Sequence, residues 1–383
     1  MLPYLTMAFL LTTLTLGENP AIKAILTNKG LQYVTEIGAE LLHDTLDNAS
    51  LPTVDGEVSL SILGTVYYTL TEMTVSKCDF KEPSVDFNED VSGFKAVISG
   101  LHMEVTGIWS TSYGIIKDGG SFVLNVWDVA VASLVSLKMN AGGRPSIGCA
   151  GCVADVGSAS IQFYGGGSWF FQIFVDFFEE RIRSTIEEQI CPLLQQRIDA
   201  LGYQLEDMGV TFQVYQDLVV DVPLTSFPAI NSSSLSLSLR GQFHSLKGVK
   251  EPPFEAQPFS FAGDVGHMLS LGLSEYTTNS AAYSYFTSGQ LQAFITDNMI
   301  PPSSPFRLNT RSFGLFIPEL PKMYPGMEMK LQVYAREAPD FRFKSGAIQT
   351  DLLGAIKAFG VKAHGALIPL FMLNAVQPDP GIE

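Results

Sequence analysis

The spacing Cys149-Ala-Gly-Cys152 is the arrangement in this sequence that is best suited to chemistry. Two cysteines separated by two residues can form a redox-active dithiol, or they can supply half of the ligands of a zinc site. A redox motif normally opens a helix after a strand, whereas the residues after Cys152 alternate as in a strand. A zinc site needs two further ligands, and the histidines do not cluster; they are His43, His102, His244, His267 and His364. The residues therefore favour neither site.

The sequence contains none of the common motifs for nucleophilic, metal-dependent or phosphate-binding chemistry. There is no G-x-S-x-G, no H-E-x-x-H and no phosphate loop. The three glycines at residues 165–167 lack the Lys-Ser/Thr of a phosphate loop, and we interpret them as a flexible hinge before a helix. The sequence predicts a protein that is not an enzyme and that needs no metal or other cofactor.

The first 17 residues have the features of a secretory signal peptide. Residues 7–16 are largely apolar, which is long enough for a signal and too short to span a bilayer. Small residues precede Glu18, where cleavage would occur. The alternative is a buried first helix, because no Lys or Arg precedes the apolar run. We expect secretion to the extracellular space, where cysteines can be oxidised and the sequons at Asn48 and Asn231 can be glycosylated.

The elements ahead of the cysteine pair are one helix and a series of long strands. Residues 21–27 fit a short strand, and Thr27 is suited to be the N-cap of an amphipathic helix that starts its apolar stripe at Leu31 and Val34. Between Val58 and Met139, apolar residues alternate and glycine-rich turns interrupt them. This pattern predicts a meander of long antiparallel strands with one apolar face.

Apolar residues at four-residue spacing follow the three glycines and predict a helix about 45 Å long. They are Phe170, Phe174, Phe178, Ile182, Ile186, Ile190, Leu194 and Ile198. Acidic residues occupy the other face of this helix. Such a stripe is either protein core or the lining of an apolar tunnel, and the residues alone favour core.

A loop rich in Pro and Ser at residues 223–234 is the best candidate for a domain boundary. After it, the second half of the sequence again contains strands and helices. Strands are predicted at 268–273, 291–296, 328–335 and 354–363. Helices are predicted at 280–288 and 311–324.

Charge is distributed unevenly along the chain, whose formal net charge is −16. Residues 1–225 contain 11 Lys and Arg against 27 Asp and Glu, whereas residues 226–383 contain 12 of each kind. A nucleic-acid partner would require a basic stripe, so we exclude that class. The acidic first half also weakens attraction to an anionic membrane surface.

Several short stretches resemble the family of bactericidal/permeability-increasing and lipopolysaccharide-binding proteins, and fish members in particular. They are Glu18-Asn-Pro, Lys29-Gly-Leu-Gln-Tyr, Gly167-Ser-Trp-Phe, Gln189-Ile-Cys-Pro, Leu271-Gly-Leu-Ser-Glu-Tyr, Thr296-Asp-Asn-Met-Ile-Pro and Arg307-Leu-Asn-Thr-Arg-Ser-Phe-Gly. The resemblance runs from about residue 18 to about residue 335 and is highly specific over that length.

The resemblance implies an α+β fold shaped like a boomerang. Two tubular barrels, each a twisted antiparallel sheet wrapped on long helices, would be joined by a central sheet. We expect a signal peptide at 1–17, an N-terminal lipid-binding barrel at 18–222, a linker with the central sheet at 223–260, and part of a C-terminal barrel at 261–383. Since the chain stops at Glu383, we expect that second barrel to be incomplete, as in a truncated product.

The family's pattern also implies a disulfide and a lipid pocket. By resemblance Cys152 pairs with Cys191, which would fix a strand to the end of the long helix, while the state of Cys78 and Cys149 stays open. Each family barrel holds phospholipid acyl chains in an apolar pocket. We expect that pocket to be lined by Leu41, Leu42, Phe170, Phe174, Phe178 and Ile182.

Family members bind the lipid A part of lipopolysaccharide through basic residues at the tip of the N-terminal barrel, and this sequence has few cations there. The remaining candidates are Lys77, Lys81, Lys117, Lys138 and Arg144. We expect a monomeric antimicrobial protein of innate immunity that binds phospholipid, meets membrane surfaces transiently, and binds lipopolysaccharide more weakly than basic members do. The alternatives are a lipid-transfer protein and a decoy that keeps the fold without a ligand.

Overall fold

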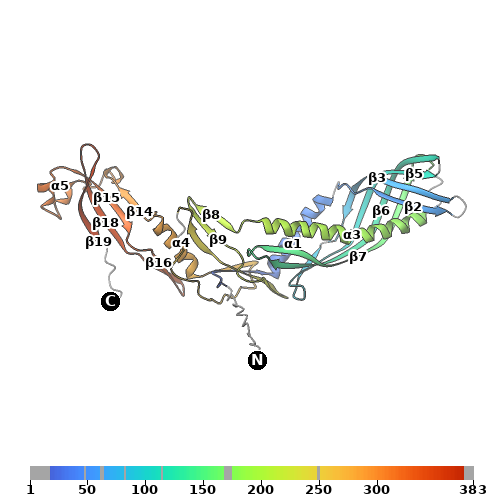
Figure 1. The fold of residues 1–383 in the computed structure, drawn as a ribbon, viewed down its shortest axis with the longest axis horizontal. Helices are drawn as coiled ribbons and strands as arrows, with labels where there is room; N and C mark the ends of the chain where they lie inside the picture. Colours follow the sequence, from blue (N-terminus) through green and yellow to red (C-terminus); the bar gives the residue numbers. More distant parts are fainter. Residues whose placement is uncertain are drawn as a thin grey trace, which may run out of the picture.

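The computed structural model describes residues 18–46, 49–60, 64–81, 83–113, 115–167, 175–247 and 251–374. The molecule is elongated, with one half built from the first part of the chain, the other from the last part, and a sheet between them (Figure 1). The expected signal peptide and the sequon at Asn48 lie outside the described residues.

A strongly curved antiparallel sheet forms the first half. Its strands are β2 (Val54–Leu60), β3 (Gly64–Asp79), β5 (Gly93–Tyr113), β6 (Ile116–Met139) and β7 (Pro145–Tyr164) in this order, with β4 (Ser84–Asn88) paired to the start of β5. The predicted alternation is present, because Val105, Trp109, Phe122 and Val126 are each at most 1% exposed and share one core. Burial of this apolar face stabilises the long strands.

Helix α3 (Val175–Asp207) lies along β7 and covers the apolar face of the sheet, with a length of about 50 Å at 1.5 Å per residue (Figure 1). Ile182 and Ile198 of the predicted stripe are buried against the sheet. The stripe therefore belongs to protein core over this part of the helix. The first residues of the predicted helix, 168–174, lie outside the described residues.

The central sheet combines strands from distant parts of the chain. Its order is β10 (Ala229–Asn231), β11 (Ser234–Leu239), β1 (Ile22–Thr27) and β13 (Leu269–Leu273), so Ile22 lies between Leu239 and Leu273. Helix α1 (Asn28–Leu46) follows β1 without a loop. Thr27 acts as its N-cap as predicted, because the Thr27 Oγ1 accepts a hydrogen bond from the Gly30 N–H at 3.4 Å.

The second half has two small sheets and a β-hairpin around helix α4 (Glu275–Thr287). One sheet contains β8 (Thr211–Tyr215), β9 (Leu218–Asp221) and β12 (Gln242–Ser245), and it crosses the predicted boundary at residue 222. The other contains β14 (Gln292–Ile295), β15 (Glu328–Ala335), β18 (Gly354–Val361) and β19 (Leu367–Asn374). The hairpin is β16 (Asp340–Lys344) with β17 (Ala347–Asp351).

The prediction of a helix at residues 311–324 is wrong. The structure has two single turns there, α5 (Thr310–Phe313) and α6 (Leu320–Met323). Gly314 ends α5, Pro318 lies between the two turns, and Pro321 lies in the first turn of α6. In one continuous helix both prolines would be interior, where a proline removes one backbone hydrogen bond and clashes with the preceding turn. Among the described helices, none is long and apolar enough to cross a membrane.

Candidate functional site

A groove of about 1030 Å³ lies between helix α1 and strand β4. The helix contributes side chains that recur every three or four residues and so share one side, namely Asn28, Gln32, Thr35, Glu36, Ala39 and Glu40. The opposite wall is formed by Phe80, Pro83, Ser84, Val85 and Asp86. A groove of this size can hold a small amphipathic molecule or one end of a larger one.

Carboxylates dominate the charge of this α1–β4 groove. Glu36, Glu40 and Asp86 line it, and no Lys, Arg or His is found among the lining residues whose side chains the structure describes. An anionic group would therefore be repelled, whereas a cationic or zwitterionic group would be tolerated. Within the part of the chain that the structure describes, no three His, Cys, Asp or Glu side chains gather as metal ligands.

The other side of α1 is apolar and poorly covered. Tyr33, Val34 and Ile37 are 50%, 56% and 50% exposed, whereas Leu31 is buried in a small core with Phe87. The sequence predicts that Leu31 and Val34 share one apolar stripe, and only Leu31 is covered because α1 contacts the protein mainly through β4, β1 and β3. Large apolar side chains gathered on one exposed helix face mark a surface that binds something apolar.

The six residues predicted to line a lipid pocket are not all described. Ile182 packs in the core beneath α3 and does not line the α1–β4 groove. Leu41 and Leu42 belong to α1 and Phe178 to α3, but the structure does not describe their side chains. Phe170 and Phe174 lie outside the described residues. For all six positions the lining role stays a prediction.

The five cations predicted for a lipopolysaccharide-binding tip do not come together. Lys117 is exposed beside the β5–β6 hairpin, but Lys138 and Arg144 flank the β6–β7 hairpin at the opposite end of β6. Lys77 and Lys81 lie near the end of β3, part way between, and Lys77 pairs with Asp79 at 3.3 Å. The grouping of Lys138 and Arg144 with a tip is therefore corrected, because both ends of one long strand cannot belong to one tip.

The β5–β6 hairpin is instead marked by an apolar residue and a carboxylate. Ile115 is fully exposed, and the Asp118 Oδ2 accepts a hydrogen bond from the Gly167 N–H at 2.5 Å. Gly166 has a φ of 53°, and a Cβ there would lie 2.2 Å from the Asp118 Oδ1. The three glycines thus allow a close approach to β6, so their interpretation as a flexible hinge is incomplete.

The cysteine pair forms neither a dithiol site nor a zinc site. Cys152 forms a disulfide with Cys191, with a Cα–Cα distance of 5.6 Å, so β7 is joined to α3 as the resemblance implies. Cys149 lies in β7 with its Sγ 3.9 Å from the Ser133 Oγ, and Cys78 is buried in the core of the first half. The predicted glycosylation site at Asn231 is exposed at the end of β10.

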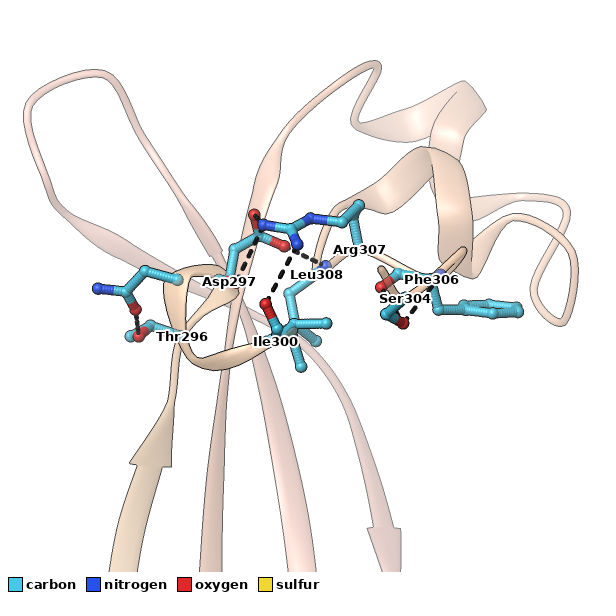
Figure 2. Close-up of polar contacts among 8 residues, drawn as sticks. Thr296, Asp297, Ile300, Ser304, Phe306, Arg307 and Leu308 are labelled. Atoms are coloured by element: carbon cyan, nitrogen blue, oxygen red, sulfur yellow. Dashed lines mark hydrogen bonds and ion pairs between the residues drawn. The ribbon is translucent and has the colours of Figure 1, made fainter. Parts of the chain in front are cut away.

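Two stretches that carry the resemblance in the second half meet in a polar cluster (Figure 2). The Arg307 guanidinium donates hydrogen bonds to the Asp297 carboxylate, to the Asp297 backbone oxygen at 3.1 Å and to the Ile300 backbone oxygen at 3.3 Å. The Leu308 N–H donates to the Asp297 Oδ1 at 2.7 Å. The Leu308 N–H and the Arg307 guanidinium hold the pKa of Asp297 below its ordinary value. The same hydrogen bonds fix the loop between residues 297 and 308.

The fold defines a class of elongated proteins in which two sheet-and-helix halves share a central sheet. The chain belongs to the LBP / BPI / CETP family, whose N-terminal domain model matches residues 30–206 and whose C-terminal domain model matches residues 213–377. The family and the fold class expected from the short stretches are confirmed.

Relatives of known name support this assignment. The chain is 35% identical over 365 residues to a bactericidal permeability-increasing protein of Sebastes schlegelii, covering 95% of this chain and 77% of the relative. It is 27% identical over 376 residues to the human lipopolysaccharide-binding protein, covering 97% and 78%. A crystal structure of lipopolysaccharide binding protein matches with a TM-score of 0.57 at 25% identity, covering 93% of this chain and 78% of that one.

Proposed function

We propose that this protein is a secreted, non-enzymatic lipid-binding protein of innate immunity. The observation that carries the proposal is the uncovered apolar side of α1 at Tyr33, Val34 and Ile37, which faces away from the α1–β4 groove. A helix that stabilises a fold through packing buries its apolar stripe, whereas this stripe is available to hydrocarbon. The names of the relatives, bactericidal permeability-increasing protein and lipopolysaccharide-binding protein, support the same class.

The energetics favour hydrocarbon as the part of the ligand that holds it. Each acyl methylene that leaves water contributes about 0.8 kcal/mol, so ten methylenes contribute roughly 8 kcal/mol. A surface ion pair contributes roughly 0–1 kcal/mol. Acyl chains therefore set whether a lipid is held, and the few charges near the groove set which headgroup is preferred.

The headgroup that fits best is neutral or zwitterionic. Glu36, Glu40 and Asp86 would repel a bare anionic headgroup and attract the cationic ammonium group of phosphatidylcholine or phosphatidylethanolamine. Lipopolysaccharide is a second, weaker ligand in this proposal, because only Lys117 among the predicted cations lies beside the β5–β6 hairpin. In this proposal the first half binds the lipid, and the second half is joined to it through the central sheet.

Native mass spectrometry of the purified full-length protein, with organic extraction of its lipids, tests the proposal. We expect co-purifying phospholipid, and we expect the variant Val34→Asp with Ile37→Asp to lose most of it. Leu201→Asp is the matched control, because Leu201 also lies on a helix and is 51% exposed. Wild-type protein without bound lipid would favour a decoy, and equal loading of the double variant would remove α1 from the site.

A further inference from the structure

The segment 296–327 joins β14 to β15 at the end of the second half that is remote from the central sheet (Figure 1). It exposes large apolar side chains to an unusual degree. Leu315 is 76% exposed and Phe316 is 71% exposed, and Phe316 stacks on Phe306 with ring centroids 5.5 Å apart. Met299 and Met323 of the same segment are 63% and 67% exposed. Side chains of this size normally contribute to a core or to a binding surface.

The exposed side chains are not part of the local core, which other residues of the segment form. Leu308 and Leu320 are buried with Met329, and Phe313 and Ile317 pack against them. The segment therefore divides its apolar residues into an inner set that packs and an outer set that does not.

Hydrogen bonds hold the segment in this arrangement. Thr310 is fully buried, and its Oγ1 donates to the Tyr324 backbone oxygen at 2.6 Å while accepting from the Met327 N–H at 3.0 Å. The Asp297–Arg307 cluster fixes the other end, and Figure 2 shows the Phe306 ring directed away from it. These contacts fix the segment on either side of Leu315 and Phe316, so the outer set is presented by a stable base.

Charge distinguishes this segment from the acidic first half. It contains Arg307, Arg311 and Lys322 against Asp297 and Glu319, an excess of one cation, whereas residues 1–225 have a net charge of −16. Arg307 is engaged by Asp297, and Lys322 pairs with Glu319 at 2.8 Å. Arg311 is exposed at the start of α5. An anionic surface would repel the first half and would be approached by this end.

We propose that segment 296–327 docks on an anionic lipid bilayer, with Leu315 and Phe316 inserted among the acyl chains and Arg311 near the lipid phosphates. Leu315 and Phe316 project from turns, which suits a deformable surface. This inference goes beyond the proposed function, because the α1 surface could hold a lipid whether or not this end meets a membrane.

Sedimentation with vesicles of phosphatidylcholine and phosphatidylglycerol tests the docking, using the full chain. Each apolar side chain of this size that leaves water should strengthen partitioning by about tenfold or more. We expect the wild type to bind and Phe316→Asp to bind at least about tenfold more weakly. The matched control is Phe227→Asp, since Phe227 is 70% exposed and lies in the linker between β9 and β10. The control should bind like the wild type.

Two further variants keep the proposal testable if Phe316→Asp fails to fold. Phe316→Trp should gain fluorescence quenching by brominated acyl chains, relative to the wild type. Arg311→Glu should weaken binding to the anionic vesicles and leave binding to pure phosphatidylcholine vesicles unchanged.

Equal binding of folded Phe316→Asp and wild type, equal loss in the Phe227→Asp control, or no added quenching at Trp in position 316 would overturn the docking proposal. Wild-type protein that carries co-purified lipid but ignores the vesicles would also overturn it while leaving the proposed function intact. Vesicle binding by protein without co-purified lipid would support the docking proposal and contradict the proposed function.

Discussion

Removing the Cys152–Cys191 disulfide should destabilise the first half strongly, because this bond joins β7 to α3 across 39 residues of chain. In the chain-entropy model, a closed loop of this length restricts the unfolded chain by about 4 kcal/mol at 25 °C. The perturbation is the double replacement Cys152→Ala with Cys191→Ala, which leaves neither half of the broken disulfide as a free thiol. We expect the free energy of unfolding of this half to fall by about that amount.

Guanidinium denaturation followed by tryptophan fluorescence measures this half selectively. All three tryptophans, Trp109, Trp127 and Trp169, lie in the first half of the sequence, and Trp109 is buried in its core. The control is Cys149→Ala, in the same strand but outside the disulfide. A loss below about 1 kcal/mol in the double variant, or a similar loss in the control, would refute the view that this bond restrains the unfolded chain.

Three other predictions follow from the contacts described above. The pKa of Asp297 lies below its ordinary 3.8, so its stabilising contribution is present above pH 3.8 and is lost as the pH falls through the lower pKa of the folded state. Asp297→Asn should therefore lower the melting temperature at neutral pH, and the gap to wild type should begin to narrow only below pH 3.8. Gly30→Ala should destabilise by about 1–3 kcal/mol in thermal unfolding, since its Cβ would lie 2.3 Å from the Met268 backbone oxygen, whereas Gly38→Ala, with no atom within 4 Å, should be neutral or stabilising. Lipopolysaccharide binding should be weaker and less dependent on salt than for basic relatives; a titration that gives nanomolar affinity lost on adding salt would contradict this.

The sequence predicts the regular parts of the fold well, because long strands and long helices repeat one physical pattern many times. Strands β5 and β6 follow from alternation over about 20 residues each, and α3 follows from its four-residue stripe. Strands β16, β17 and β19 are short or carry little alternation, so the sequence pattern does not predict them. Short elements are specified by neighbours that are distant in sequence.

The candidate site is less predictable for a related reason. The α1–β4 groove is lined by polar residues such as Gln32 and Glu36, which look like an ordinary solvated helix face. The exposed apolar side at Val34 looks like an ordinary core stripe. The packing of α1 beside β4 is what turns the polar face into a groove wall and leaves the apolar side exposed, and the sequence does not show this packing. The Asp297–Arg307 contact joins a residue in a single helical turn to a loop residue ten positions later, where no periodic signal exists.

Strand β1 has a consequence for biosynthesis. It is the first described element of the chain, yet both of its neighbours in the central sheet, β11 and β13, come more than 200 residues later. At 5–20 residues per second, translation from β1 to β13 takes on the order of tens of seconds. During that interval both edges of the nascent strand lack their native partners, so a chaperone that shields the start of the chain should increase the yield of folded product.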